Sequence, residues 1–250
     1  MSANDHPVVG IIGGIGPDAT VDLMQRVICA TPAKDDADHI HLLVDNNPKV
    51  PSRIAALVEG HGESPAPVLV QMAQNLERAG AALLAIPCNT AHAYLDPIRS
   101  AVAIPVLDMI QMTADRLTEL SPQPETVGII ASSAVLKAEL YGKALEAHGL
   151  HVVLPTVADQ DAVMVLIKKV KSRQVSMADH QRFSDIINCL VESGAQAIAV
   201  ACTDLSVMGQ DGLISEVPLV DALDVLTEAI VTGVEQLVQS PVRYSIQGVQ

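Results

Sequence analysis

One sequence pattern occurs twice in this chain. Each copy has a Gly-Ala pair, a short apolar run, and a cysteine followed by polar residues; the copies span 79–92 and 193–204. Cys88 and Cys202 end the two apolar runs and are 114 residues apart. An uninterrupted short apolar run is typical of a parallel strand buried on both faces. We therefore expect each cysteine at the point where such a strand gives way to a polar loop.

Two further landmarks recur in the same order. Val-Gly-Ile-Ile at 9–12 is repeated at 127–130, and Ile-Pro-Val-Leu-Asp at 104–108 is repeated as Val-Pro-Leu-Val-Asp at 217–221. These offsets predict a duplicated unit of roughly 115 residues, which is too long for a solenoid repeat. Two similar lobes, rather than an array, are the expected organisation. Packed face to face, they would bring two thiols to opposite sides of one substrate.

The pattern along the chain alternates between strands and helices. Strands are predicted at 8–12, 39–44, 82–86, 104–107, 126–131, 151–154 and 196–200. Helices are predicted at 18–30, 65–79, 91–101, 109–120, 134–148, 159–170, 178–193 and 222–239. This alternation predicts an α/β fold with two similar doubly wound parallel-sheet lobes and an active site in the cleft between them. We expect one lobe to contain 1–108 plus 222–250, with the C-terminal helix returning to it, and the other 109–221.

Charge and composition exclude several classes of protein. A net charge of −14 argues against nucleic-acid or anionic-membrane partners. No apolar run approaches the length of a membrane span, and the polar start at 1–7 shows no secretory signal. We expect a cytoplasmic protein with reduced thiols.

Four segments carry a resemblance to a known family. They are Gly13-Gly14-Ile15-Gly16-Pro17, Asn46-Asn47-Pro48 with Pro51-Ser52-Arg53, Pro87-Cys88-Asn89-Thr90-Ala91-His92, and Cys202-Thr203-Asp204. Together they resemble the cofactor-independent aspartate/glutamate racemase superfamily, and within it the aspartate racemase branch.

The resemblance implies a two-base mechanism in which Cys88 and Cys202 are the catalytic residues. One thiolate takes the α-proton of an amino acid, and the opposite thiol returns a proton to the other face. It implies no pyridoxal phosphate, metal or nucleotide cofactor. Aspartate or glutamate is the implied substrate, and a homodimer is the implied assembly.

The same resemblance supplies the residues expected to bind the substrate. Arg53 would hold a carboxylate, and Lys171 would hold another, although Lys168 and Lys169 leave the register open. The loops beside the cysteines would add hydrogen-bond donors, and the glycine-rich turn would approach the ligand. The remaining candidates are Gly14, Ile15, Asn89, Thr90, Ser132, Thr203 and Asp204.

Some positions depart from the family pattern and put the exact substrate in question. Asp204 stands where a glutamate is usual, Ser206 where a proline is usual, and Val135 where a threonine is usual. Two alternatives therefore stay open. The chain could catalyse related chemistry, as a maleate isomerase, hydantoin racemase or arylmalonate decarboxylase does, or it could be a non-catalytic dicarboxylate-binding protein.

For the other cysteines and for His92, we expect structural roles or leave the role open. Cys29 and Cys189 lie in the middle of predicted helices beside apolar residues, so we expect them in the core. No Cys-x-x-Cys motif or close Cys/His cluster indicates zinc. His92, one helical turn after Cys88, would orient the cysteine loop or tune the thiol, or would only pack at a helix start.

Overall fold

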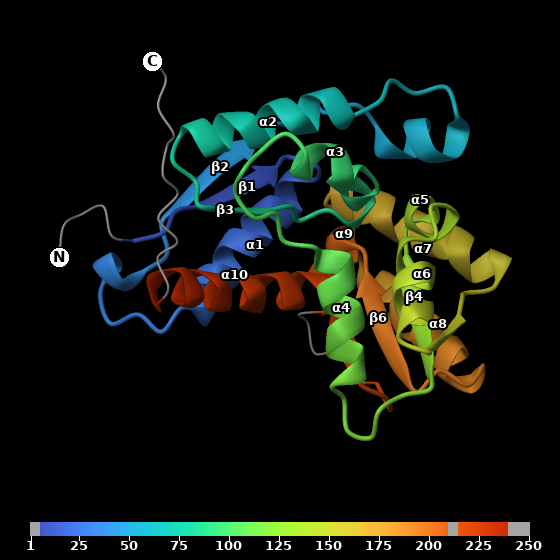
Figure 1. The fold of residues 1–250 in the computed structure, drawn as a ribbon. Coiled ribbons are helices and arrows are strands. Elements are labelled where there is room, and N and C mark those ends of the chain that lie inside the picture. Colours follow the sequence, from blue (N-terminus) through green and yellow to red (C-terminus); the bar gives the residue numbers. More distant parts are fainter. Residues whose placement is uncertain (1–5, 210–214, 240–250) are drawn as a thin grey trace, which may run out of the picture.

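A computed structural model of the chain describes residues 6–209 and 215–239, which form two parallel sheets (Figure 1). The first sheet has the order β2-β1-β3, and the second has the order β5-β4-β6-β7. The strands are β1 (Val9–Gly13), β2 (Leu42–Asn46), β3 (Leu83–Ala85), β4 (Thr126–Ala131), β5 (His151–Val153), β6 (Ala197–Ala201) and β7 (Leu219–Asp221).

The two sheets repeat one topology. In each, the first strand of the half lies between the second and the third. The fourth segment then pairs with the third: β7 pairs with β6, and residues 104–107 join β3 through a single bridge between Leu84 and Val106. The predicted fold class, with two duplicated parallel-sheet lobes, is confirmed.

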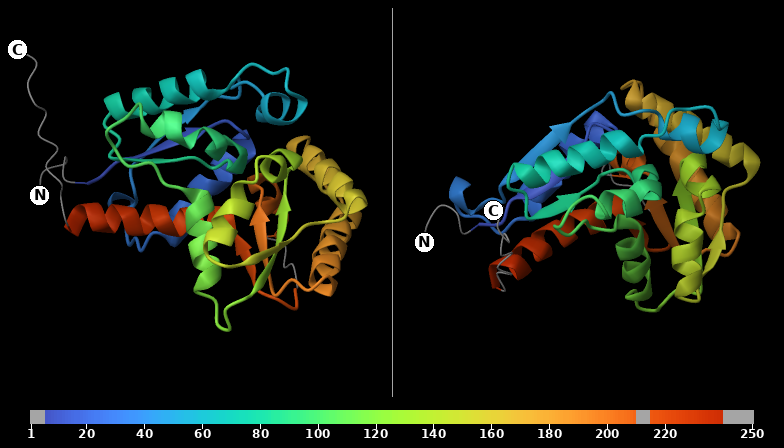
Figure 2. Two further views of the ribbon diagram at one scale, coloured as in Figure 1. Left: turned by 45° about the vertical axis from the view of Figure 1, so that its right-hand side comes forward. Right: turned by 45° about the horizontal axis from the view of Figure 1, so that its top comes forward.

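Helices cover both faces of each sheet (Figures 1 and 2). On the first sheet, α1 (Pro17–Ala30) and α10 (Ala222–Gln239) cover one face, and α2 (Ala66–Arg78) and α3 (Leu95–Arg99) cover the other. The second sheet lies between α4 (Met109–Thr118) with α6 (Leu140–Ala147) and α7 (Val157–Lys171) with α8 (Met177–Glu192). The short elements are α5 (Ser133–Lys137), α9 (Thr203–Gly209), η1 (Asp36–Asp38), η2 (Ala55–Glu59) and η3 (Asn89–Tyr94).

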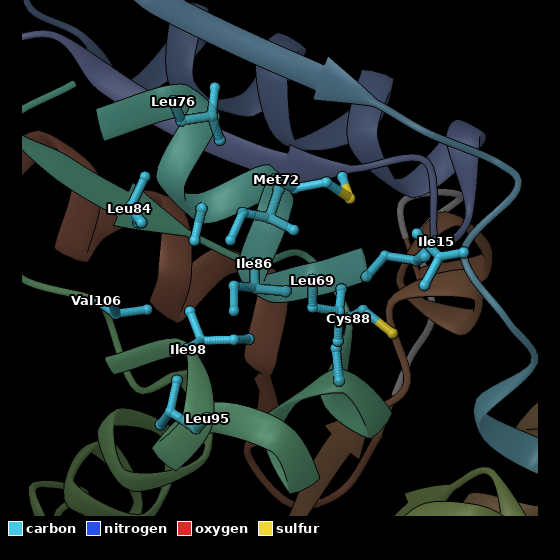
Figure 3. Close-up of a cluster of buried hydrophobic side chains, with 14 of the residues drawn as sticks. Ile15, Leu69, Met72, Leu76, Leu84, Ile86, Cys88, Leu95, Ile98 and Val106 are labelled. Carbon is cyan, nitrogen blue, oxygen red and sulfur yellow. The ribbon is translucent and has the colours of Figure 1, made fainter. Parts of the chain in front are cut away.

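The buried strands explain the apolar runs in the sequence. Val9 and Ile11 of β1 pack on the α1 and α10 side, whereas Ile12 packs on the α2 side. Successive side chains of a strand point to opposite faces, so a strand covered on both faces must be apolar throughout. Figure 3 shows the cluster on the α2 side, with Cys88 at its margin and the sulfur directed away from Ile86 and Ile98.

The last helix packs with the first lobe. Leu223, Leu226 and Ile230 of α10 share a core with Leu23 and Val27 of α1. Val225 of the same helix packs in the cluster of the second sheet. The division into 1–108 plus 222–250 and 109–221 stays a proposal. Residues 1–5, 210–214 and 240–250 of these ranges lie outside the described residues.

Several predicted elements differ from the structure. The helix expected at 134–148 is broken into α5 and α6, because Glu139 between them has a positive φ of 52° that no α-helix accommodates. The helix expected at 91–101 begins as the 3₁₀ segment η3, and the strand expected at 39–44 begins only at Leu42. Strand β7 and helix α9 were not predicted as elements.

The expectation that Cys29 and Cys189 belong to the core is wrong. Both side chains are exposed. They lie on the solvent faces of α1 and α8, whose buried faces are formed by residues such as Val27 and Leu190. No helix in the described part of the chain is both long and apolar enough to cross a membrane.

Candidate active site

A pocket of about 380 Å³ lies where the carboxyl ends of the two sheets meet. The first lobe lines it with the turn after β1, the segment after β2 and the loop after β3. The second lobe adds the turns after β4 and β6 and the last turns of α7. Ten of the eleven predicted site residues line this pocket: Ile15, Arg53, Cys88, Asn89, Thr90, Ser132, Lys171, Cys202, Thr203 and Asp204.

Cys88 reaches the pocket from the loop that follows β3. Its side chain is buried, and its sulfur lies 3.5 Å from Thr90 Oγ1. The extended backbone at Cys88 ends the strand segment and begins η3, so the sulfur points out of the core toward the pocket (Figure 3).

His92 holds the Cys88 loop in place. Its Nε2 accepts a hydrogen bond from the Met109 N–H at 3.1 Å, so the ring proton is on Nδ1, which donates to the Cys88 carbonyl at 2.9 Å. Burial lowers the pKa of His92, which favours the neutral ring that this pattern requires. Of the roles that the sequence leaves open for His92, orientation of the Cys88 loop fits these contacts.

Cys202 enters the pocket directly after β6 and is also buried. Burial, and then the carboxylate of Asp204, raise the pKa of this thiol to about 12. The N–H groups of Asp204 and Leu205, together with Lys171, act in the opposite direction. The thiol also donates to Asp204 Oδ2 over 4.0 Å. Cys202 is therefore protonated at neutral pH and suited to donating a proton.

Lys171 and Asp204 form an ion pair in the pocket wall, with Nζ 2.7 Å from Oδ2. Of the three neighbouring lysines, Lys171 lines the pocket, whereas Lys168 and Lys169 do not, and Lys169 pairs with Asp179. A Cβ added at Gly16 would lie 3.1 Å from Asp204 Oδ1, so the glycine turn leaves room for the pair.

Two buried donors that line the pocket have no partner among the described residues: Arg53 Nε and Asn89 Nδ2. Arg53 is held by Nη1, which donates to the carbonyls of Pro51 at 3.1 Å and Val50 at 3.4 Å. Asn89 is held by Oδ1, which accepts from the Tyr141 hydroxyl at 2.6 Å. Buried polar groups are rarely left unpaired, so both donors fit a ligand that accepts hydrogen bonds, such as a carboxylate.

The remaining predicted residues support the loops in different ways. Thr203 Oγ1 donates to the Pro87 carbonyl at 3.0 Å and so joins the two cysteine loops. Ser132 lines the pocket at the end of β4. Gly14 does not line the pocket: it has a φ of +84°, and an added Cβ would lie 2.3 Å from the Asn47 backbone nitrogen. Its place is in the turn that carries Ile15.

Sequence reasoning missed part of the apolar lining. Val135, noted only as a departure from the family pattern, lines the pocket together with residues that carried no prediction of their own: Val50, Ser52, Ile54 and Ile167. The neighbours of Arg53 could have been found by their position beside it. Ile167 could have been found because it lies one helical turn before Lys171.

Comparison with known proteins identifies the family of the chain. Residues 12–230 match the family model described as Asp/Glu/Hydantoin racemase. The chain belongs to this racemase family. This membership confirms the family resemblance and supports an isomerase as the class of enzyme. In the described residues, no group of three or more His, Cys, Asp or Glu side chains is arranged to hold a metal ion.

Individual members of the racemase family resemble the chain over nearly its whole length. The aspartate racemase of Picrophilus torridus is 29% identical, with a TM-score of 0.79 over 92% of this chain and 94% of that one. The broad specificity amino-acid racemase RacX of Bacillus subtilis (strain 168) is 27% identical over 229 residues, which cover 90% of this chain and 97% of RacX. The glutamate racemase of Francisella tularensis subsp. tularensis SCHU S4, solved with D-glutamate, is 18% identical. It covers 93% of this chain and 82% of its own, with a TM-score of 0.66, and shows the shared fold.

Proposed function

We propose that this chain is an amino-acid racemase that interconverts L- and D-aspartate or L- and D-glutamate without a cofactor. The observation that carries the proposal is the position of Cys88 and Cys202, which follow corresponding strands of two duplicated sheets and line one pocket. Two thiols supplied by two lobes are what proton exchange on opposite faces of one carbon requires.

In the proposed reaction, the thiolate of one cysteine takes the α-proton and becomes a thiol. The electron pair left on the α-carbon is delocalised into the α-carboxylate. The thiol of the other cysteine then donates its proton to the opposite face and becomes the thiolate. One C–H bond breaks and one forms, so the configuration inverts while the composition of the amino acid is unchanged. The reverse reaction exchanges the roles of the two cysteines.

The main energetic difficulty of the reaction is the removal of the α-proton, and donors in the pocket would lower this barrier. An amino-acid α-proton is less acidic than a thiol by more than ~10 pKa units, or upwards of ~14 kcal/mol. Fixed donors directed at the carboxylate lower this barrier, because they stabilise the negative charge that develops there. The unpaired donors of Arg53 and Asn89 suit this role.

The charges in the pocket favour a dicarboxylic amino acid. Arg53 and Lys171 are cations, and Asp204 is an anion. This set complements the two carboxylates and one ammonium group of aspartate or glutamate. In such a complex, the Lys171–Asp204 ion pair would open: Lys171 would pair with a substrate carboxylate, and Asp204 with the substrate ammonium group.

A second candidate is a racemase that accepts several amino acids. The aliphatic side chains of Val50, Ile54, Val135 and Ile167 favour it, because they could contact an apolar substrate side chain. The relative from Bacillus subtilis is named a broad specificity amino-acid racemase.

The test is incubation with L-aspartate, L-glutamate and L-leucine in D₂O, without added cofactor, followed by α-proton NMR and chiral chromatography. The proposal predicts α-deuterated D-aspartate or D-glutamate. Faster reaction of L-leucine would favour the broader racemase. Binding without any exchange would contradict both and favour a non-catalytic binding protein.

Cysteine variants test the two-base scheme. Cys88→Ala and Cys202→Ala should each abolish racemisation in both directions. The exposed cysteines provide matched controls, since Cys29→Ala and Cys189→Ala should retain the wild-type rate. Full turnover in either pocket variant would overturn the scheme.

We also propose a cytoplasmic homodimer. All four cysteines of the chain are free, as is typical of proteins in reducing compartments. Sedimentation equilibrium tests the assembly: a mass of about twice the 26.3 kDa chain is expected, and a mass equal to that of one chain would contradict the dimer.

A further inference from the structure

A closed ring of hydrogen bonds ties the catalytic loop of the second lobe to the first lobe. Ser206 Oγ donates to Asp221 Oδ1 at 2.6 Å, and Arg26 Nη1 donates to Asp221 Oδ2 at 3.1 Å. Arg26 Nη2 closes the ring by donating to the Ser206 carbonyl at 3.3 Å. The three residues come from α9, from the end of β7 and from α1, so the ring spans both lobes.

The ring is shielded and strongly charged. Ser206 is 1% exposed, and the side chains of Arg26 and Asp221 are 12% and 16% exposed. Arg26 also pairs with Asp22 at 2.9 Å and with Asp224 at 2.5 Å, so one guanidinium is shared by three carboxylates. Arg26 makes a bidentate contact with Asp22 of its own helix, through Nε at 3.1 Å and Nη2 at 2.9 Å, which fixes the orientation of the guanidinium. Arg26 therefore acts as a rigid anchor for the helix that carries Ser206.

That helix determines the surroundings of Cys202. α9 begins at Thr203, and the N–H groups of Leu205 and Ser206 in its first turn donate to the Cys202 carbonyl at 2.8 Å and 3.2 Å. The N–H groups of Asp204 and Leu205 also lower the pKa of the Cys202 thiol. Any rotation of α9 would therefore change the surroundings of this thiol.

We infer that Arg26, Ser206 and Asp221 form a positioning network that holds the first turn of α9 against Cys202 and thereby orients this thiol in the pocket. The inference rests on the proposed function for its catalytic consequence. None of the three residues lines the pocket, so they act through Cys202 and not on a substrate.

Three other groups face Cys202, and of these Asp204 moves with α9, whereas the other two lie on other helices. They are Asp204 on its own helix, Lys171 on α7 and the hydroxyl of Tyr141 on α6. Replacing Ser206 removes one hydroxyl and changes no charge. A change in the acidity of Cys202 in such a variant therefore reports the position of α9.

The experiment compares Ser206→Ala with the wild type by alkylation with iodoacetamide between about pH 7 and pH 10, with each cysteine followed separately by peptide mass spectrometry. The alkylation rate of Cys202 should change roughly three- to tenfold at each pH, because displacement of α9 moves both the Asp204 carboxylate, which raises the pKa of this thiol, and the N–H groups, which lower it. Cys88 in the same molecules should react at the wild-type rate. In the racemase assay, kcat should fall while KM stays unchanged.

Thr227→Val is the matched control. Thr227 is another buried hydroxyl, but it donates to the Leu223 carbonyl within α10 and takes no part in the ring. This variant should leave Cys202 reactivity unchanged. Arg26→Lys is a second test that retains the positive charge but removes the bidentate contact; it should change the Cys202 alkylation rate in the same direction as Ser206→Ala does.

Wild-type alkylation rates at Cys202 in both Ser206→Ala and Arg26→Lys would overturn the network. This readout does not depend on racemase activity. A shift at Cys202 in a protein without racemase activity would therefore support the network while contradicting the proposed function. An active racemase in which neither variant changes the alkylation rate of Cys202 would support the proposed function and contradict the network.

Discussion

The ammonium group of Lys171 lies 2.7 Å from Asp204 Oδ2, and the same carboxylate oxygen lies 4.0 Å from the Cys202 sulfur. Asp204 thus lies between Lys171, the proposed carboxylate-binding cation, and Cys202, a proposed proton donor. A substrate carboxylate that displaced Asp204 from Lys171 would leave an uncompensated negative charge beside the thiol. Such a charge raises the pKa of the thiol, so the state of this ion pair would set how readily Cys202 holds its proton.

Asp204→Asn tests this connection. Burial is the largest cause of the raised pKa of Cys202 and persists in the variant, but the second cause, the Asp204 carboxylate, is removed. The pKa should therefore fall from about 12, and alkylation of Cys202 at a fixed pH should become roughly tenfold faster. Peptide-resolved alkylation measures this rate.

The matched control is Asp18→Asn, which removes a carboxylate paired with the exposed Arg173 outside the pocket. It should leave the reactivity of Cys202 unchanged. If Asp204→Asn also left it unchanged, the carboxylate would have no effect on the thiol.

Arg53→Gln tests the carboxylate-binding role of the first lobe. The variant loses the charge and the Nε donor that has no partner among the described residues. A charge-assisted hydrogen bond contributes about 1.5–3 kcal/mol, so KM for the substrate should rise about 10- to 100-fold, as measured by steady-state racemisation. Arg78→Gln, which alters an exposed arginine bonded to Asn75, is the control and should retain the wild-type KM. A normal KM in Arg53→Gln would remove Arg53 from the binding site.

The duplicated sequence pattern accounts for how much of the fold was predictable. Buried strands such as β1 and β6 are uninterrupted apolar runs, and the repeat gave their order twice. The break between α5 and α6 was not predictable, because Glu139 has no special preference for a positive φ. Strand β7 has only three residues, and its landmark at 217–221 was recognised as a repeat but not as an element.

The site was predictable where a motif marks it. Cys88, Cys202 and Arg53 lie in motifs, and all three line the pocket. The apolar pattern of its helix does not separate Ile167 from the core, and only its position one helical turn before Lys171 relates it to the site. Contacts made across the lobes, such as that of Ser206 with Asp221, depend on how two distant segments pack. A single sequence contains no signal for such contacts.

Buried His92 predicts a pH dependence of stability. Its pKa in the folded protein is lowered by burial, whereas in the unfolded chain it is about 6.5. Below that value the unfolded chain binds the extra proton, so this contribution to the free energy of unfolding is present above about pH 6.5 and is lost as the pH falls. The slope should approach about 1.4 kcal/mol per pH unit.

Urea denaturation between about pH 5 and pH 7 measures this slope in the wild type and in His92→Gln. The variant should be less stable at pH 7, because Met109 N–H loses its acceptor, but its stability should fall less steeply toward acid. His151→Gln, at an exposed histidine of β5, should keep the wild-type slope. Parallel slopes in wild type and His92→Gln would show that His92 does not titrate differently on unfolding.

Gly14 should be required for folding and not for contact with the substrate. In Gly14→Ala, a side chain at a φ of +84° adds a left-handed strain of about 1–2 kcal/mol. Its Cβ would also lie 2.3 Å from the Asn47 nitrogen, which forces the turns after β1 and β2 apart. Overpacking of this kind costs about 1–3 kcal/mol more. Gly80→Ala separates the two effects, because Gly80 has a φ of +101° but its added Cβ would meet nothing within 4 Å. Urea denaturation should show the larger loss in Gly14→Ala, by at least the overpacking cost. Equal losses in the two variants would mean that the approach of Asn47 to Gly14 relaxes without cost.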